Sequence, residues 1–220
     1  MKVDWNVFWP RIVESTGETI LMVIATLIFG SILGISIGLL LYVTRKGNIL
    51  ENQILFQILN ILINIIRPIP FIILLVALSP LTRAIIGTTI GTWAAIFPMT
   101  IAASFGIARV VENNLVGIDP GVVEAAKAMG ASPIQIIFTV LIPEALGPLI
   151  LGLTFVTVSL IDFSAMAGTV GGGGLGHVAM TYGYQRFDAS VMLVTVIILI
   201  VLVQFAQWFG NTLSRKILRR

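Results

Sequence analysis

The stretch TILMVIATLIFGSILGISIGLLLYV, residues 19–43, carries no charged side chain. A helix needs about 20 apolar residues to cross the hydrocarbon core of a bilayer, so this stretch is long enough to span a membrane. The composition of the whole chain agrees, since 57% of its 220 residues are hydrophobic and 10% are charged. Soluble domains carry about 25% charged residues. The chain is therefore predicted to be an all-α membrane protein.

Four further segments are apolar enough to cross a membrane, which predicts a polytopic domain of five transmembrane helices covering residues 1–220. After the first span, at residues 19–43, the predicted spans are residues 54–78, 84–108, 145–161 and 189–210. Arg67 interrupts the second of them. A polar segment, residues 111–143, separates the third span from the fourth.

The distribution of basic residues predicts the orientation of the chain, because Lys and Arg are concentrated on the cytoplasmic side of membrane proteins. With five spans, four basic residues fall on the side of the N-terminus: Lys2, Arg11, Arg83 and Arg186. Eight fall on the other side: Arg45, Lys46, Arg109, Lys127, Arg215, Lys216, Arg219 and Arg220. We therefore expect the N-terminus outside and the C-terminus in the cytoplasm. The net charge of +3 then follows from topology and does not indicate nucleic acid binding.

Residues 1–18 precede the first span and are amphipathic. Trp5, Phe8, Trp9 and Ile12 fall on one face at helical spacing. This pattern predicts an interfacial helix anchored by its tryptophans at the lipid headgroups. A docking surface for a partner protein is the alternative.

Small residues recur every four positions in two of the predicted spans. The first carries Gly30, Gly34 and Gly38, and the third carries Gly87 and Gly91. Such ridges let the backbones of membrane helices approach closely. They predict either packing within the subunit or an interface between two copies of the chain.

The polar segment 111–143 has signals for two short helices. Asp119 is suited to cap the first helix, with Pro120 at its first position. Gly130 is suited to the position after its end, where a positive φ is required.

Ser132 is predicted to cap the second helix, and Gln135 completes a capping box with it. Pro143 is expected to break this helix before the fourth span. The small residues Ala125, Ala126, Ala128 and Ala131 favour a surface that another protein contacts closely, although packing of the first helix on the same chain is equally compatible with the pattern.

The sequence Glu124-Ala125-Ala126, then Gly130, then Val140-x-Ile142-Pro143 resembles the EAA loop of permease subunits in ATP-binding-cassette importers. The spacing of the family pattern is kept, with two conservative replacements in its last part. The resemblance implies a cytoplasmic coupling helix that sits in a groove of a separate ATPase. The predicted docking residues are Asp119, Glu124, Ala125, Ala126, Gly130, Ala131 and Pro133.

Two more stretches, residues 67–83 and 164–184, resemble the permease of the methionine importer, a family with five spans per subunit. The resemblance implies transport of L- and/or D-methionine across a bacterial inner membrane, with another amino acid or small solute as the alternative. It also implies a homodimer, two ATPase subunits and an extracytoplasmic substrate-binding protein.

Polar residues inside the second span suggest a translocation pathway. Asn60, Asn64, Arg67 and Phe71 are spaced to share one helix face, and such a stripe faces a bundle interior or an aqueous path. Hydrogen bonding between helices is the alternative for the asparagines, and Arg67 snorkelling to the headgroups is the alternative for the arginine.

Ser164 and Met166, near the end of the fourth span, are candidates for a gate. A thioether side chain is polarisable and adapts its shape, so Met166 suits a gate, a contact with a thioether substrate, or ordinary packing.

The sequence argues against a catalytic role for this chain. Gly171-x-Gly173-x-x-Gly176 matches the spacing of a dinucleotide-binding turn, but a predicted membrane helix precedes it where that motif needs a strand. A close-packed turn is the expected role of these glycines. With no cysteine and one histidine, His177, a metal site is not expected, and no Gly-x4-Gly-Lys-Ser/Thr motif is present. We expect no cofactor in this chain, with ATP and Mg bound by the partner ATPase.

Two other classes of membrane protein fit the sequence less well. An intramembrane enzyme needs a catalytic constellation at membrane depth, whereas the carboxylates here lie mostly in loops and at helix ends. A secondary transporter typically contains internal repeats with broken helices, and the two halves of the sequence are not similar.

Overall fold

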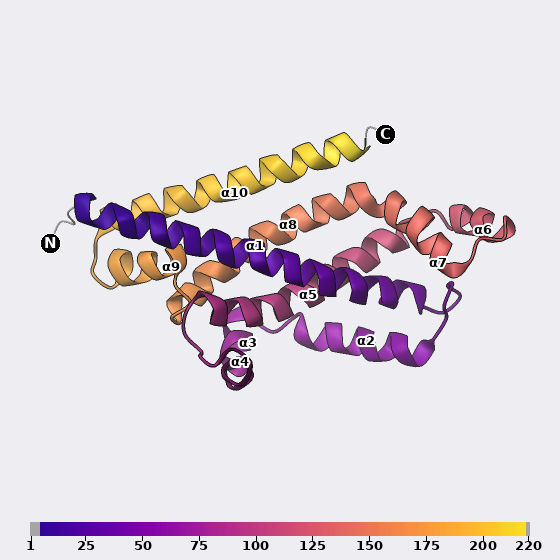
Figure 1. Cartoon of the computed structure of the whole chain (residues 1–220), viewed down its shortest axis with the longest axis horizontal. Helices are drawn as coiled ribbons and strands as arrows, with labels where there is room; N and C mark the ends of the chain where they lie inside the picture. Colours follow the sequence, from indigo (N-terminus) through magenta and orange to yellow (C-terminus); the bar gives the residue numbers. More distant parts are fainter. Residues whose placement is uncertain (1–4, 219–220) are drawn as a thin grey trace. The chain divides into compact units, whose positions relative to one another are not determined.

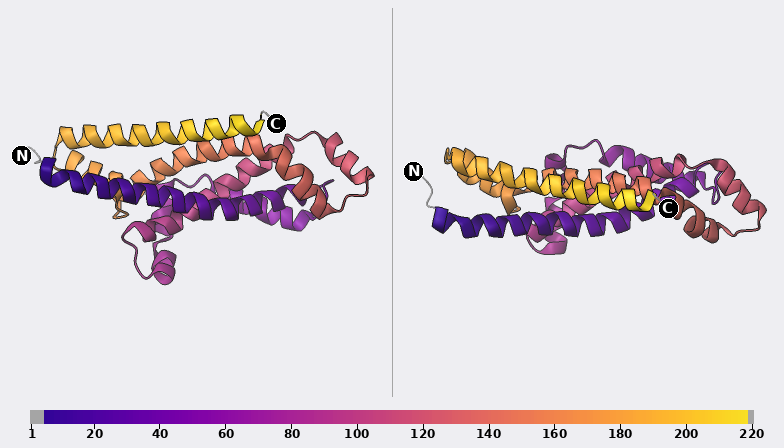
Figure 2. Two further views of the ribbon diagram at one scale, coloured as in Figure 1. Left: turned by 45° about the horizontal axis from the view of Figure 1, so that its top comes forward. Right: turned by 90° about the horizontal axis from the view of Figure 1, so that it is seen from above.

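The computed structural model describes residues 5–218, and all regular secondary structure in that part of the chain is helical (Figure 1). The prediction of an all-α protein is confirmed. Four helical stretches are long and apolar enough to cross a membrane, or five if the interrupted pair α2 and α3 counts as one span. The four long helices are α1 (Trp5–Val43), α5 (Thr92–Val116), α8 (Ile142–Thr169) and α10 (Ala189–Leu218), coloured from indigo to yellow in Figures 1 and 2.

Helix α1 joins the predicted interfacial helix to the first predicted span without a break. The separation expected at residue 18 is wrong, because no residue there ends a helix: Gly17 does not have a positive φ. The Thr16 hydroxyl donates to the Ile12 carbonyl and stays within the helix. Residues 1–4 lie outside the described residues, and the position of this segment at the membrane surface stays a prediction.

The second predicted span is interrupted. Helix α2 covers Gln53–Ile66, α3 covers Phe71–Ala77 and α4 covers Ser79–Ile86. Pro68 and Pro70 lie between α2 and α3, and neither has an N–H to donate to a preceding turn. A single straight span over residues 54–78 is therefore replaced by two shorter helices.

The third predicted span, residues 84–108, is displaced along the sequence. Helix α4 ends at Gly87, whose φ is 86°, and α5 begins only after Gly91, whose φ is 100°. Both glycines are turn residues, so the predicted small-residue ridge of the third span does not form there. At its other end α5 extends to Val116, beyond the predicted boundary.

The fourth and fifth spans are longer than the predicted ranges 145–161 and 189–210. Between α7 (Pro133–Ile136) and α8, residues Ile137–Leu141 form a π-helix, η1. The break expected at Pro143 does not occur, because the Ile142 N–H already bonds five residues back, to Ile137, when the chain reaches the proline. Pro143 then takes the second position of α8, where its missing N–H is tolerated.

The chain forms two compact units, to both of which α1, α5, α8 and α10 contribute residues. The first unit comprises the described residues up to Gly30, with Ile69–Ala103 and Thr157–Gln207. Within its core the rings of Phe71 and Phe163 stack with centroids 4.4 Å apart.

The first unit also contains the predicted glycine turn, followed by α9 (Gly174–Val178) and the π-helix η2 (Ala179–Tyr184). The Gly174 N–H donates to Glu18 Oε2 at 2.6 Å. A Cβ on Gly176 would lie 2.2 Å from the Ala165 carbonyl oxygen. The prediction of a close-packed turn is confirmed.

The second unit comprises Ser31–Pro68, Ser104–Val156 and the described chain from Trp208. Here α1 packs against α5 at a glycine seam, formed by Gly34 and Gly38 against Ile107 and Ala108. A Cβ on Gly34 would lie 2.6 Å from the Ile107 Cβ, and one on Gly38 would lie 2.5 Å from the Ala108 carbonyl oxygen. Of the two predictions for this ridge, packing within the subunit is confirmed for these glycines.

The loop between α1 and α2 is held by local hydrogen bonds. The Asn52 side chain caps α2 by accepting the Leu55 N–H at 3.0 Å. The Gly47 N–H donates to Glu51 at 3.0 Å, and this bond, with a second from Gln53, holds the pKa of the Glu51 carboxyl below its usual value. These bonds fix where α2 begins.

Candidate functional site

The most exposed candidate site is the coupling segment, residues 117–141, which follows α5. Its first helix is α6 (Pro120–Ala128), and Asp119 caps it by accepting the Gly121 N–H at 2.8 Å. Gly130 follows the end of α6 with φ 80°, and its N–H donates to the Lys127 carbonyl. The predicted start and end of this helix are confirmed.

The second short helix of the coupling segment, α7, begins with the predicted capping box. The Ser132 N–H donates to Gln135 Oε1 at 2.8 Å, and the Gln135 N–H donates back to the Ser132 hydroxyl at 3.4 Å. Side chains within the segment therefore satisfy two of the backbone N–H groups at this helix start.

Helix α6 has one face against its own chain and one face open. Val123 and Ala126 are buried, at 8% and 4% exposure, where α6 packs on α7 and η1. Ala126 was predicted to dock a partner, but its side chain faces its own chain, because it lies one helical turn from Val123. Met129, at 82% exposure, extends the open face.

The other predicted docking residues remain accessible. Ala131 is half-buried, and five are exposed: Asp119, Glu124, Ala125, Gly130 and Pro133. The open face presents a carboxylate beside small side chains, which suits close contact with another protein.

The prediction that Asn60, Asn64, Arg67 and Phe71 lie on one face of a single helix is wrong. Asn60 and Asn64 lie on α2, whereas Arg67 is the exposed residue that ends α2. Phe71 begins α3 and is buried at 5% exposure. The prediction fails because it treated α2 and α3 as one continuous helix.

The two asparagines instead belong to a polar bridge formed by Asn60, Asn64, Arg109 and Glu112. The Arg109 guanidinium donates to Asn64 Oδ1 at 2.6 Å and to Asn60 Oδ1 at 3.0 Å, and it forms an ion pair with Glu112. Asn64 also donates to Asn60. The prediction of hydrogen bonding between helices is confirmed for these asparagines, with a partner on α5 that was not predicted.

The ion pair in the polar bridge is largely shielded from solvent. The Arg109 side chain is 18% exposed and that of Glu112 is 6% exposed. Removing one partner of a buried ion pair costs about 3–5 kcal/mol, because it leaves an uncompensated charge. The i, i+3 spacing of Arg109 and Glu112 is visible in the sequence, but their link to α2 is a tertiary contact without a sequence signal.

The two gate candidates differ in burial. Ser164 is 1% exposed, and its hydroxyl donates to the Ile161 carbonyl within α8 at 2.7 Å. Met166 is 43% exposed. Of the residues predicted in this part of α8, Met166 is therefore the one open to contact, and the gate role of both residues stays a prediction.

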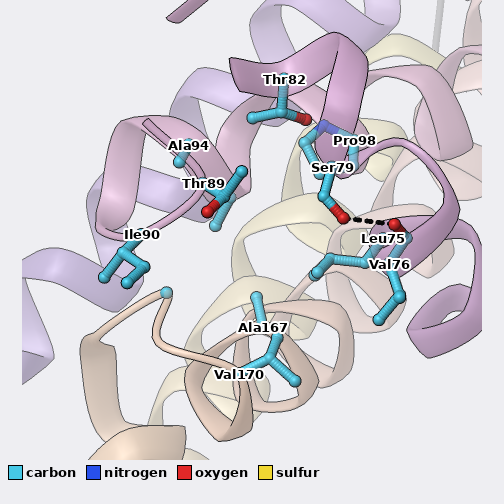
Figure 3. A pocket seen from close by; sticks show the side chains of 12 residues that line it. Leu75, Val76, Ser79, Thr82, Thr89, Ile90, Ala94, Pro98, Ala167 and Val170 are labelled. Atoms are coloured by element: carbon cyan, nitrogen blue, oxygen red, sulfur yellow. Dashed lines mark hydrogen bonds between the residues drawn. The ribbon is translucent and has the colours of Figure 1, made fainter. Parts of the chain in front are cut away.

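A cavity of about 190 Å³ lies in the first unit between α3, α4, α5 and the end of α8 (Figure 3). Figure 3 shows apolar side chains around most of it, with the hydroxyls of Ser79, Thr82 and Thr89 also in its wall. The Ser79 hydroxyl donates to the Val76 carbonyl. No charged residue lines the cavity, so it suits a small apolar group. Seven of its lining residues lie within residues 67–83 and 164–184, the stretches that resemble the methionine permease, although none of them was predicted as a site residue.

Among the described residues, no group of three or more His, Cys, Asp or Glu side chains is placed to hold a metal ion. His177 is exposed on α9, and its ring nitrogen lies 3.4 Å from the Thr181 hydroxyl.

Comparison with known proteins places these features in a family. Residues 30–219 match the family described as the inner membrane component of binding-protein-dependent transport systems. The chain belongs to this family. The coupling segment lies entirely within the matched region.

Individual relatives of this transport family are similar over nearly the whole chain. A probable D-methionine transport system permease from Vibrio cholerae is 48% identical over 206 residues, covering 94% of this chain and 92% of that protein. A second, from Pasteurella multocida, is 45% identical, covering 94% of this chain and 96% of that protein. A chain in an inward-facing structure of the MetNI methionine ABC transporter matches with a TM-score of 0.95 and 43% identity, over 98% of this chain and 99% of that chain.

Proposed function

We propose that the chain is the permease subunit of an ATP-driven importer of methionine, L- and/or D-. The permeases from Vibrio cholerae and Pasteurella multocida are named for D-methionine transport, and the similar solved structure is a methionine transporter. The observation that carries the proposal is the exposed Glu124-Ala125 edge of α6, which occupies the position of the EAA pattern and is held by its own caps.

The proposed assembly contains two copies of this chain, two ATPase subunits and an extracytoplasmic substrate-binding protein, in a bacterial inner membrane. A symmetric pair is the commonest arrangement for an oligomer of identical chains. ATP and Mg are bound by the ATPase subunits, so this chain is a transport subunit and not an enzyme. Its own contribution is the pathway and the surface through which the ATPase acts.

The proposed orientation has the N-terminus outside and the coupling segment in the cytoplasm, in agreement with the excess of basic residues on that side. ATP-driven movement of the ATPases displaces α6. Only residues 117–119 separate α6 from the end of α5, so the displacement passes to α5 over a short link.

The predicted pathway residues Arg67, Ser164 and Met166 are kept in this proposal as residues near the pathway. Of the two residues on α8, Met166 is exposed and Ser164 is buried. Phe71 contributes by packing on Phe163 rather than by contacting solvent.

A charge reversal on α6 tests the proposed docking. Glu124→Lys changes an exposed side chain, so membrane insertion and folding are expected to be unaffected. Like-charge contacts across an interface are strongly unfavourable, and a loss of 1.4 kcal/mol already weakens binding tenfold. We expect the amount of ATPase that co-purifies with the tagged chain to fall about tenfold or more.

The matched control is Glu14→Lys, the same change at an exposed position of α1 that is predicted to lie outside. It is expected to leave co-purification unchanged. Normal methionine uptake by the Glu124→Lys variant contradicts the docking assignment. Labelling of a cysteine introduced at Ala128 by an impermeant reagent added outside intact cells contradicts the orientation.

A further inference from the structure

The polar bridge joins two helices that are not adjacent in the sequence. Arg109 on α5 reaches Asn60 and Asn64, one turn apart on α2, with bonds of 3.0 and 2.6 Å. One guanidinium thereby fixes the position of α2 along α5. Neither the proposed docking surface nor the predicted pathway explains this arrangement.

The α5 side of the bridge is shielded from solvent, whereas Asn64 on α2 is exposed. The ion pair between Arg109 and Glu112 is shielded, so separating its charges without new partners is unfavourable. Next to it, Ile63 of α2 is fully buried in a core cluster with Ala108 of α5, the residue before Arg109. Polar and apolar contacts therefore both hold α2 to the same part of α5.

The bridge lies close in sequence to the coupling segment. Glu112 is about one turn from the end of α5 at Val116, and α6 begins at Pro120. Leu115 and Ile118 on either side of this end are buried, at 1% and 9% exposure. A displacement of α6 therefore acts on α5 next to the bridge.

Both helices held by the bridge continue into elements that line the cavity of Figure 3. Helix α5 itself contributes Ala94, Ala95 and Pro98 to the cavity wall. Helix α2 leads through residues 67–70 into α3, which contributes Leu75 and Val76. One part of the cavity wall thus belongs to α5, and another belongs to α3, which follows α2 in the chain.

We propose that Arg109 is a positioning residue that binds α2 to α5, so that movement of the coupling helix α6 displaces both helices as one body. This proposal rests on the proposed function, because it requires that an ATPase moves α6. Asn60 and Asn64 are then the contacts through which α2 follows α5, rather than residues that meet the substrate.

The double variant Asn60→Ala with Asn64→Ala tests this role, because it removes the hydrogen bonds from Arg109 to α2 and leaves the Arg109–Glu112 ion pair and the apolar contacts of Ile63 intact. We expect the ATPase to co-purify as before, and the methionine taken up per ATP hydrolysed in proteoliposomes to fall about fivefold or more, the size of a typical coupling between sites. An unchanged ratio of uptake to hydrolysis overturns the proposal. A structural defect alone lowers the yield of assembled complex without changing that ratio.

The matched control is Gln57→Ala with Asn113→Ala, which removes one exposed amide from each of the same two helices outside the polar bridge. It is expected to keep the wild-type ratio of uptake to hydrolysis. A control that lowers the ratio as much as the test variant overturns the assignment to the bridge.

If the double variant does not assemble, a distance measurement on the otherwise unchanged complex tests whether α2 and α5 move together. The chain has no cysteine, so Gln57→Cys and Asn113→Cys provide spin-label sites without background. In complexes with one labelled permease copy, we expect the same distance between the labels in the nucleotide-free and ATP-bound states. A distance that changes between the states overturns the proposal that α2 and α5 move as one body.

The two proposals fail in different ways. A wild-type complex that takes up no methionine when ATP is hydrolysed contradicts the proposed function. A wild-type complex that transports, together with a double variant of unchanged coupling ratio, contradicts only the role of the bridge.

Discussion

The glycine seam and helix α6 represent two opposite kinds of helix contact in this protein. At the seam, Gly34 and Gly38 leave no room for a side chain between α1 and α5. Helix α6 is held by two small buried side chains and its caps, and the rest of its surface is open. The seam therefore constrains the backbone, whereas α6 constrains only one face and leaves the other for a partner.

The largest expected effect is at the seam. In the Gly38→Leu variant the new Cβ meets the Ala108 backbone carbonyl at 2.5 Å, which a change of rotamer cannot relieve. Overpacking usually destabilises a folded protein by about 1–3 kcal/mol, and we expect this variant to be destabilised by more than that. The measurement is the yield of monodisperse protein in detergent and its thermal unfolding.

The control for the seam is Gly17→Ala in the same helix, where a Cβ meets nothing within 4 Å. It is expected to stabilise α1 by about 0.5–1 kcal/mol, because glycine inside a helix is unfavourable. If Gly38→Leu unfolds at the same temperature as wild type, the close approach of α1 and α5 is refuted.

An intermediate effect is expected from two neighbouring alanines on α6. Ala126→Leu places a larger side chain in the buried face and is expected to destabilise the coupling segment by about 1–3 kcal/mol. Ala125→Leu, on the exposed face, is expected to change stability by less than about 0.5 kcal/mol and to reduce co-purification of the ATPase. Thermal unfolding and co-purification distinguish the two variants, and equal behaviour of both contradicts the two-sided description of α6.

The smallest effect is expected at the cap of α6. Asp119→Ala removes the acceptor for the Gly121 N–H and is expected to cost about 1 kcal/mol, confined to this helix. Hydrogen exchange of residues 121–128 is expected to become faster, with no change in α5. Asp162→Ala, an exposed carboxylate inside α8, is the control, and faster exchange throughout the chain in the Asp119→Ala variant argues against a local role for the cap.

The coupling segment was the part most accurately predicted from the sequence. Asp119, Gly130 and the Ser132–Gln135 box act on backbone groups within a few residues, so their effect can be deduced from local sequence. The composition also sufficed for the fold class and for most of the apolar helices. The family resemblance pointed to Glu124 and Ala125, which are exposed on α6, but also to Ala126, which is buried.

The wrong predictions have a common cause. They depend on tertiary contacts and on irregular backbone, neither of which can be deduced from the spacing of residues in the sequence. The interruption between α2 and α3 separates Asn64 from Phe71, so a helical wheel drawn across it is misleading. The π-helix η1 allows the chain to pass Pro143 without a break. The link from Arg109 to α2 joins residues more than forty positions apart, and no local pattern predicts it.

The local caps of α6 and α7 have a consequence for how this family can diversify. Asp119, Ser132 and Gln135 cap both short helices with hydrogen bonds that lie within residues 117–141. The start of each helix is therefore determined by residues of the segment itself. The segment is suited to exchange as a block between permeases, because α6 packs on α7 and η1, which belong to the same block. A chimaera made in this way would bind a different ATPase, while its transmembrane helices stay the same.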